Sequence, residues 1–164
     1  MSVHTVALSI HVAAGTVGLV LGPVLMLLPK RPGAHTRLGE VYHWTFLVLF
    51  VSAVALAILN PDVWWLAPVG AFSYAFALMG YLAAKRRGPG WLPRHVAGQG
   101  GSYIAMVSAL LTVNWEALTG TAGTSSFLPF VLPSIVGSPI IVWVTAQVAA
   151  GRRPKAWVRA RATG

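Results

Sequence analysis

The sequence predicts an all-α membrane protein with five transmembrane helices, and three observations predict it. Of its 164 residues, 56% are hydrophobic and only 9% are charged, whereas soluble domains carry roughly a quarter charged residues. The apolar residues fall into five segments, each close to the ~20 residues that a helix needs to cross a bilayer. The connections are short, so we expect one transmembrane helical domain over residues 1–164, with spans at about residues 6–28, 41–59, 66–84, 96–118 and 127–150.

The first span has one face of glycines with a histidine among them. His11, Gly15, Gly18 and Gly22 recur at helical spacing, and small residues four apart let two helices approach closely. We expect this face to pack against a neighbouring helix, which points His11 inward. An ionisable side chain inside a membrane is a functional candidate.

The second and third spans flank a turn at residues 60–62. Pro29, Pro32 and Gly33 end the first helix, and the second helix is expected to start near Leu38. The third span holds no Asp, Glu, Lys, Arg or His until its end, so we interpret it as structural.

The fourth span is too polar to face lipid. Its polar residues His95, Gln99 and Ser102 share one side with Met106, and a stripe of small residues begins next to them at Gly98. Unpaired polar groups are costly in hydrocarbon, so we expect this helix to lie inside a bundle. A tight turn over residues 88–93 precedes it.

The fifth span contains three prolines, Pro129, Pro133 and Pro139, so we expect it to be kinked or to begin irregularly. Residues 120–126 form a predicted flexible outer loop. Residues 151–164 form a predicted basic cytoplasmic tail that lies on anionic headgroups.

The twelve basic residues predict the topology. All of them lie between spans one and two, between spans three and four, or after span five. The positive-inside rule therefore places the N-terminus outside and the C-terminus in the cytoplasm. This clustering next to apolar spans also argues against nucleic acid as the partner of a chain with a net charge of +9.

The residues and motifs that several classes of chemistry require do not occur in this sequence. The chain has no cysteine, which excludes disulfides, thiolate metal sites and thiol catalysis. It has no Gly-x-Ser-x-Gly elbow, no His-Glu-x-x-His zinc motif and no mid-span carboxylate or internal repeat typical of transporters. Catalytic residues therefore stay unknown, and whether the protein is an enzyme stays open.

Histidine is the remaining candidate, because a neutral imidazole binds metals and haem iron. His43 and His95 are predicted near the cytoplasmic ends of spans two and four. If they faced each other, a haem b could sit between them, with Arg37 and Arg94 near its propionates. The shallow position of His95 after Pro93 argues against a buried macrocycle.

A smaller site for a divalent metal needs less depth, and its predicted ligands are His35, His43, His95 and Glu40. His11 is a further candidate cofactor residue, although it lies toward the opposite leaflet. The alternative is that these histidines only form hydrogen bonds that fix the helix register.

Three signatures occur in order along the chain: IHVAAGTVGLVLGP, HTRLGEVYHW and RHVAGQGGSYIAMVSALL, followed by LPSIVGSP. Together they resemble a family of small bacterial predicted integral membrane proteins classed as a domain of unknown function. The resemblance implies a multi-span protein of the bacterial cytoplasmic (inner) membrane with recurrent histidines at His11, His35 and His95. It implies no substrate, reaction or cofactor.

Two functions are therefore expected. The first is binding of haem b or a metal ion by intramembrane histidines, for a redox role. The alternative is a non-catalytic accessory or structural subunit of a larger membrane complex, or a homo-oligomer, with the lipid bilayer as the common partner.

Overall fold

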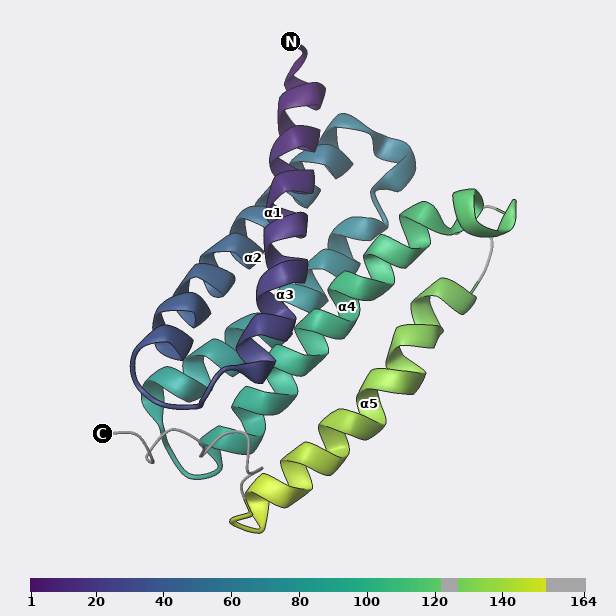
Figure 1. Cartoon of the computed structure of the whole chain (residues 1–164). Coiled ribbons are helices and arrows are strands. Elements are labelled where there is room, and N and C mark those ends of the chain that lie inside the picture. Colours follow the sequence, from purple (N-terminus) through teal and green to yellow (C-terminus); the bar gives the residue numbers. More distant parts are fainter. Residues whose placement is uncertain (122–126, 153–164) are drawn as a thin grey trace. The chain divides into compact units, whose positions relative to one another are not determined.

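A computed structural model describes residues 1–121 and 127–152, and these contain helices but no strand. The helices are α1 (Val3–Leu27), α2 (Ala34–Leu59), α3 (Leu66–Arg86), α4 (Trp91–Thr119) and α5 (Leu128–Ala149), with a short 3-10 helix η1 (Pro61–Val63) after α2 (Figure 1). All five α-helices are long and apolar enough to cross a membrane. The predicted all-α, five-span fold is thus confirmed, and the chain is a multi-pass membrane protein. Most of the predicted outer loop and basic tail lies outside the described residues.

Two helices begin earlier than the sequence predicted. Helix α2 begins at Ala34 rather than near Leu38, after Gly33 at φ +119°. Helix α4 begins at Trp91, after Gly90 at φ +66°, so Pro93 lies in its first turn and not in the preceding connection. A proline in the first turn removes an N–H that has no partner within the helix. Hydropathy marks the part of a helix that crosses hydrocarbon, and both helices extend beyond that part.

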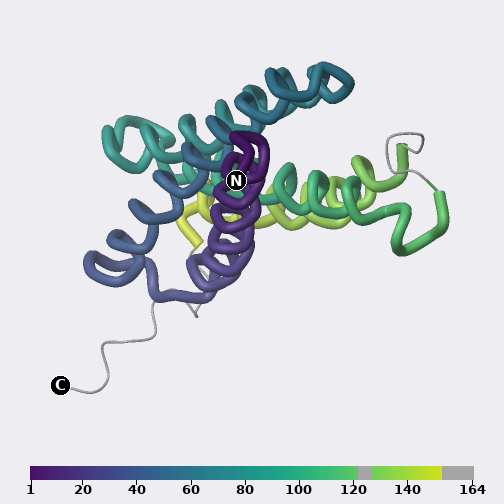
Figure 2. Tube along the Cα trace, turned by 90° about the horizontal axis from the view of Figure 1, so that it is seen from above, coloured from purple at the N-terminus to yellow at the C-terminus, as the bar shows by residue number. Residues whose placement is uncertain are grey.

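The packing divides the described chain into two compact units, Met1–Tyr74 and Ala75–Ala150. In the first unit, α1 and α2 lie side by side as an antiparallel pair joined by residues 28–33 (Figures 1 and 2). The buried residues of α1 are Ala14, Gly18 and Gly22. The predicted small-residue face of the first span is therefore a buried face.

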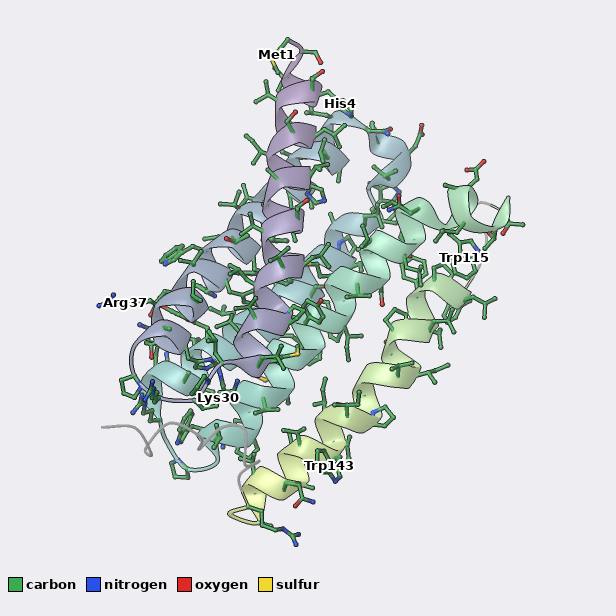
Figure 3. The ribbon with its side chains drawn as sticks, viewed as in Figure 1. Met1, His4, Lys30, Arg37, Trp115 and Trp143 are labelled. Atoms are coloured by element: carbon green, nitrogen blue, oxygen red, sulfur yellow. The ribbon has the colours of Figure 1, made fainter. Side chains whose placement is uncertain are left out.

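Lys30 closes the end of α1. Its ammonium nitrogen Nζ donates hydrogen bonds to the backbone carbonyls of Leu25, Met26 and Leu28, the last two at 2.8 Å. These carbonyls have no partner within the helix, and a cation also suits the negative end of the helix dipole. Lys30 lies where α1 turns toward α2 (Figure 3). Partial burial lowers the pKa of Lys30 to about 8.

In the second unit, α4 packs against the C-terminal half of α3 through backbone. A Cβ atom on Gly98 would lie 2.6 Å from both the amide nitrogen of Gly80 and the carbonyl oxygen of Phe76. No side chain fits in that space, so the two helices touch where both residues are glycine. The sequence marked Gly98 as part of a small-residue stripe, and the stripe faces α3 at this point.

The other neighbour of α4 in this unit is α5, which lies beside it in both views (Figures 1 and 2). Isoleucines fill the spaces over glycines: Ile141 lies over Gly100, and Ile104 lies over Gly137. Helix α5 continues through Pro133 and Pro139. The hydroxyl of Ser108 on α4 donates to the carbonyl of Phe130 at 3.2 Å, which adds a partner for backbone near the first of these internal prolines.

Candidate functional site

The residues predicted to bind a cofactor belong to different units. His11, His35, Arg37, Glu40 and His43 lie in the first unit, whereas Arg94 and His95 lie in the second. Each set is therefore described within its own unit.

His11 is held against the neighbouring helix of the first unit. Its Nδ1 lies 3.1 Å from the hydroxyl oxygen of Ser52 on α2. The hydroxyl of Ser52 donates its own proton to the carbonyl of Leu49, at 2.9 Å. Its oxygen therefore accepts the hydrogen bond from His11. Nδ1 therefore carries the proton, and the lone pair of the neutral ring is on Nε2. The prediction that His11 points toward a neighbouring helix is confirmed.

His95 is held in the same tautomer by backbone. Its Nδ1 lies 2.9 Å from the carbonyl oxygen of Gly80, and a carbonyl can only accept, so Nδ1 donates and Nε2 bears the lone pair. Because α4 begins at Trp91, His95 lies about 6 Å along the helix axis from its first residue. It is thus three residues deeper in its helix than a start after Pro93 implied. The indole ring of Trp91 lies next to it, with ring centroids 6.3 Å apart.

His43 is the most buried of the candidate histidines, with 5% of its surface exposed. Its ring stacks on Tyr74 at a centroid distance of 6.0 Å and an interplanar angle of 28°. Tyr74 in turn stacks on Phe50 at 5.2 Å with the rings parallel to within 1°. His43 lies nine residues into α2, about 14 Å along the axis, and is therefore farther from the helix end than the sequence suggested.

The sequence interpretation missed Tyr74, because it treated the third span as structural. An aromatic residue with a polar hydroxyl among alanines was the available signal. It also missed the carbonyl of Gly80, which no side-chain pattern could have indicated.

The other predicted ligands of the first unit lie nearer the start of α2. His35 and Glu40 are half-buried, and Arg37 is exposed (Figure 3). His35 and His43 are eight residues apart on one helix, a rise of about 12 Å. That separation does not favour their binding the same small ion, since metal–nitrogen bonds are only about 2 Å long.

Arg94, the predicted partner of a propionate, is exposed at the start of α4. A Cβ on Gly90 would lie 3.6 Å from its Nη2 atom, so the guanidinium lies back over the turn before the helix. Its predicted role toward a propionate stays a prediction.

Below His95 on α4, Gln99 also binds backbone. Its side-chain nitrogen Nε2 donates to the carbonyl of Ala77 on α3 at 3.0 Å. One turn on, Ser102 is fully buried and donates to the carbonyl of Gln99. The predicted polar side of the fourth span is therefore turned into the second unit and not to lipid.

Within residues 1–121 and 127–152, no group of three or more His, Cys, Asp or Glu side chains is placed to hold a metal ion. No protein-family model, no curated protein and no solved structure matches the chain. The arrangement of the side chains thus carries the functional argument alone.

Proposed function

We propose that this chain is a multi-pass protein of the bacterial inner membrane that binds haem b through an intramembrane imidazole, for a redox role. The observation that supports it best is the hydrogen bond from His95 Nδ1 to the carbonyl of Gly80, at 2.9 Å. Histidines that ligate metals generally donate their other ring N–H to a carbonyl or carboxylate, which fixes the tautomer and the ring orientation. His95 meets this condition before any ligand binds.

Haem fits the donor set better than an ion held by protein alone. Haem iron takes its four equatorial ligands from the porphyrin and needs only one or two axial ligands from the protein. A zinc site needs three or four protein ligands, and no such group occurs in the described part of the chain. Bound haem would supply one-electron chemistry, while the chain would supply the oriented imidazole, which lies beside the indole ring of Trp91.

The proposed orientation places His95 on the cytoplasmic side. The basic residues that flank α3 and α4 at this end mark the cytoplasmic face by the positive-inside rule. The N-terminus is then outside. A cysteine-labelling scan with a membrane-impermeant maleimide tests this, because the natural chain has no cysteine. We expect labelling of a Ser2→Cys variant in intact cells and no labelling of a Gly88→Cys variant.

The absorption spectrum of the protein purified in mild detergent tests the haem proposal. We expect a Soret band and iron in stoichiometric amount. His95→Ala should lose the band, whereas His4→Ala, which changes an exposed histidine outside the candidate set, should keep it. A colourless, iron-free wild-type protein with the expected helical circular dichroism would contradict the proposal.

One observation favours the second candidate function, an accessory or structural subunit. Trp143 on α5 is 60% exposed and lies about 9 Å along the axis from the end of its helix at Ala149 (Figure 3). Tryptophan prefers the headgroup level over the hydrocarbon, so a partner protein is a suitable cover for this side chain. Crosslinking in cells followed by mass spectrometry should then capture a stoichiometric partner, and Trp143→Ala should reduce its yield. If the protein is a monomer and no partner is captured, only lipid covers the side chain of Trp143.

A further inference from the structure

The turn between α3 and α4 gathers four cations in ten residues. They are Lys85, Arg86, Arg87 and Arg94, and all are exposed. The single acidic residue between residues 75 and 150 is Glu116. It lies 25 residues beyond Trp91 on the same helix, about 38 Å along the axis. The only carboxylate between residues 75 and 150 is therefore far from this turn.

Two of these guanidinium groups are held over the turn itself. Arg87 has φ +48°, a conformation uncommon for a residue with a side chain, and its guanidinium carbon lies 5.6 Å from the ring centroid of Trp91. Its Nε also donates to the carbonyl of Ala84 at 3.4 Å. The guanidinium of Arg94 lies over Gly90, with the 3.6 Å approach given above. Like charges gathered at one turn repel each other unless an anion joins them.

Aromatic rings at the same turn indicate where that anion comes from. The ammonium of Lys85 lies 5.3 Å from the ring centroid of Tyr81, and Trp91 lies under Arg87. Both rings are half-buried. Tyrosine and tryptophan prefer the level of the lipid headgroups, so the ring contacts place the cations next to headgroup phosphates. Guanidinium binds a phosphate through two parallel hydrogen bonds.

We propose that the α3–α4 turn is a binding site for the phosphate of an anionic phospholipid, with Arg87 and Arg94 as its two ligands. The contact with the ring of Trp91 orients Arg87 before the lipid arrives. The site uses no histidine, although it shares Arg94 with the propionate contact predicted for haem.

Thermal unfolding in lipid nanodiscs tests the proposal. The full-length chain is compared in discs of phosphatidylcholine alone and in discs that contain one fifth phosphatidylglycerol. We expect a Tm about 3 °C higher with the anionic lipid, because a ligand that binds only the folded state stabilises it. The variant Arg87→Gln/Arg94→Gln should lose most of this shift. The matched pair Arg31→Gln/Arg152→Gln, which removes two exposed arginines elsewhere, should keep most of it.

Three outcomes would overturn the site. The first is an equal loss of the Tm shift in both variant pairs, which would mean that the shift depends on general surface charge. The second is an equal Tm increase when inorganic phosphate is added to phosphatidylcholine discs, which indicates a site for any phosphate. The third is the absence of a shift in the wild type. If the double variant does not fold, lipid analysis of the detergent-purified wild type decides: we expect about one phosphatidylglycerol retained per chain, and none retained would contradict the site.

Discussion

The two units hold their membrane histidines through different kinds of hydrogen-bond acceptor. In the first unit, His11 donates to a side chain, the hydroxyl of Ser52 on the neighbouring helix. In the second unit, His95 donates to backbone, the carbonyl of Gly80. The packing follows the same division: large rings fill the space around His43 in the first unit, whereas glycine backbone touches glycine backbone in the second.

This difference in packing predicts how the stability of each unit responds to substitution. Side chains can move to other rotamers and absorb an added methyl group, but two backbones in contact cannot. We infer that the second unit is the more sensitive to added volume. The first unit, whose contacts are made by side chains, should tolerate a small added volume better.

The largest effect is expected at the glycine contact. Gly98→Ala places a Cβ 2.6 Å from backbone atoms of Gly80 and Phe76, so α3 and α4 must separate. We expect the free energy of unfolding to fall by about 3 kcal/mol, as measured by circular dichroism during denaturation in detergent. Gly15→Ala is the control, because its Cβ would lie 3.5 Å from Leu49, an ordinary contact. Equal effects at both positions would remove the distinction between the units.

The next effect concerns Gln99, whose amide donates across to α3. Gln99→Met keeps an unbranched chain of similar length and removes the donor. We expect a loss of about 1 kcal/mol in the free energy of unfolding, as for other hydrogen bonds between membrane helices. Asn114→Leu should change it little, because that amide donates to Leu110 of its own helix. A larger loss at Asn114 would contradict the packing described for α4.

A smaller effect is expected at Ser52. Ser52→Ala should lower the free energy of unfolding by about 0.6 kcal/mol, the mean for such bonds in membranes. A double-mutant cycle with His11→Phe measures the coupling directly. Additive effects would show that the bond contributes nothing, and the side-chain-based view of the first unit would then fail.

The smallest effect is the pH dependence from Lys30. Its pKa in the folded protein is lowered to about 8, so between pH 8 and about 10.4 the unfolded chain holds more protons than the folded one. The free energy of unfolding should therefore rise with pH across this window and be unaffected by Lys30 below it. The rise should be much smaller than the full pKa shift implies, because Lys30 is half-exposed and solvent screens its charge. Lys30→Arg, which stays charged, should remove this rise. Unfolding in uncharged detergent at pH 7 and pH 10 measures the difference.

The prediction of the fold succeeded where hydropathy alone decides it. Apolar length determined the five spans, and proline and glycine marked the end of α1. The predicted start of α4 was about three residues late, because Pro93 was assigned to the turn although a proline fits the first turn of a helix. The predicted start of α2 was four residues late, because polar residues at the end of a span still form helix. Hydropathy cannot detect them.

The candidate site was predictable in part. The helical spacing of Gly18 and Gly22 and of His95, Gln99 and Ser102 correctly identified the inward faces. The partners were not predictable. Spacing along one helix shows which side a residue faces and not which atom it meets, so Ser52, Tyr74 and the carbonyl of Gly80 were missed.

The sequence by itself determined that this protein crosses a membrane five times with buried polar faces, because a bilayer excludes charge and demands helices of fixed length. Only the tertiary structure decided which ring nitrogen carries the proton in His11 and His95. A tautomer depends on the acceptor that the folded chain brings to Nδ1, and for His95 that acceptor is the backbone of another helix.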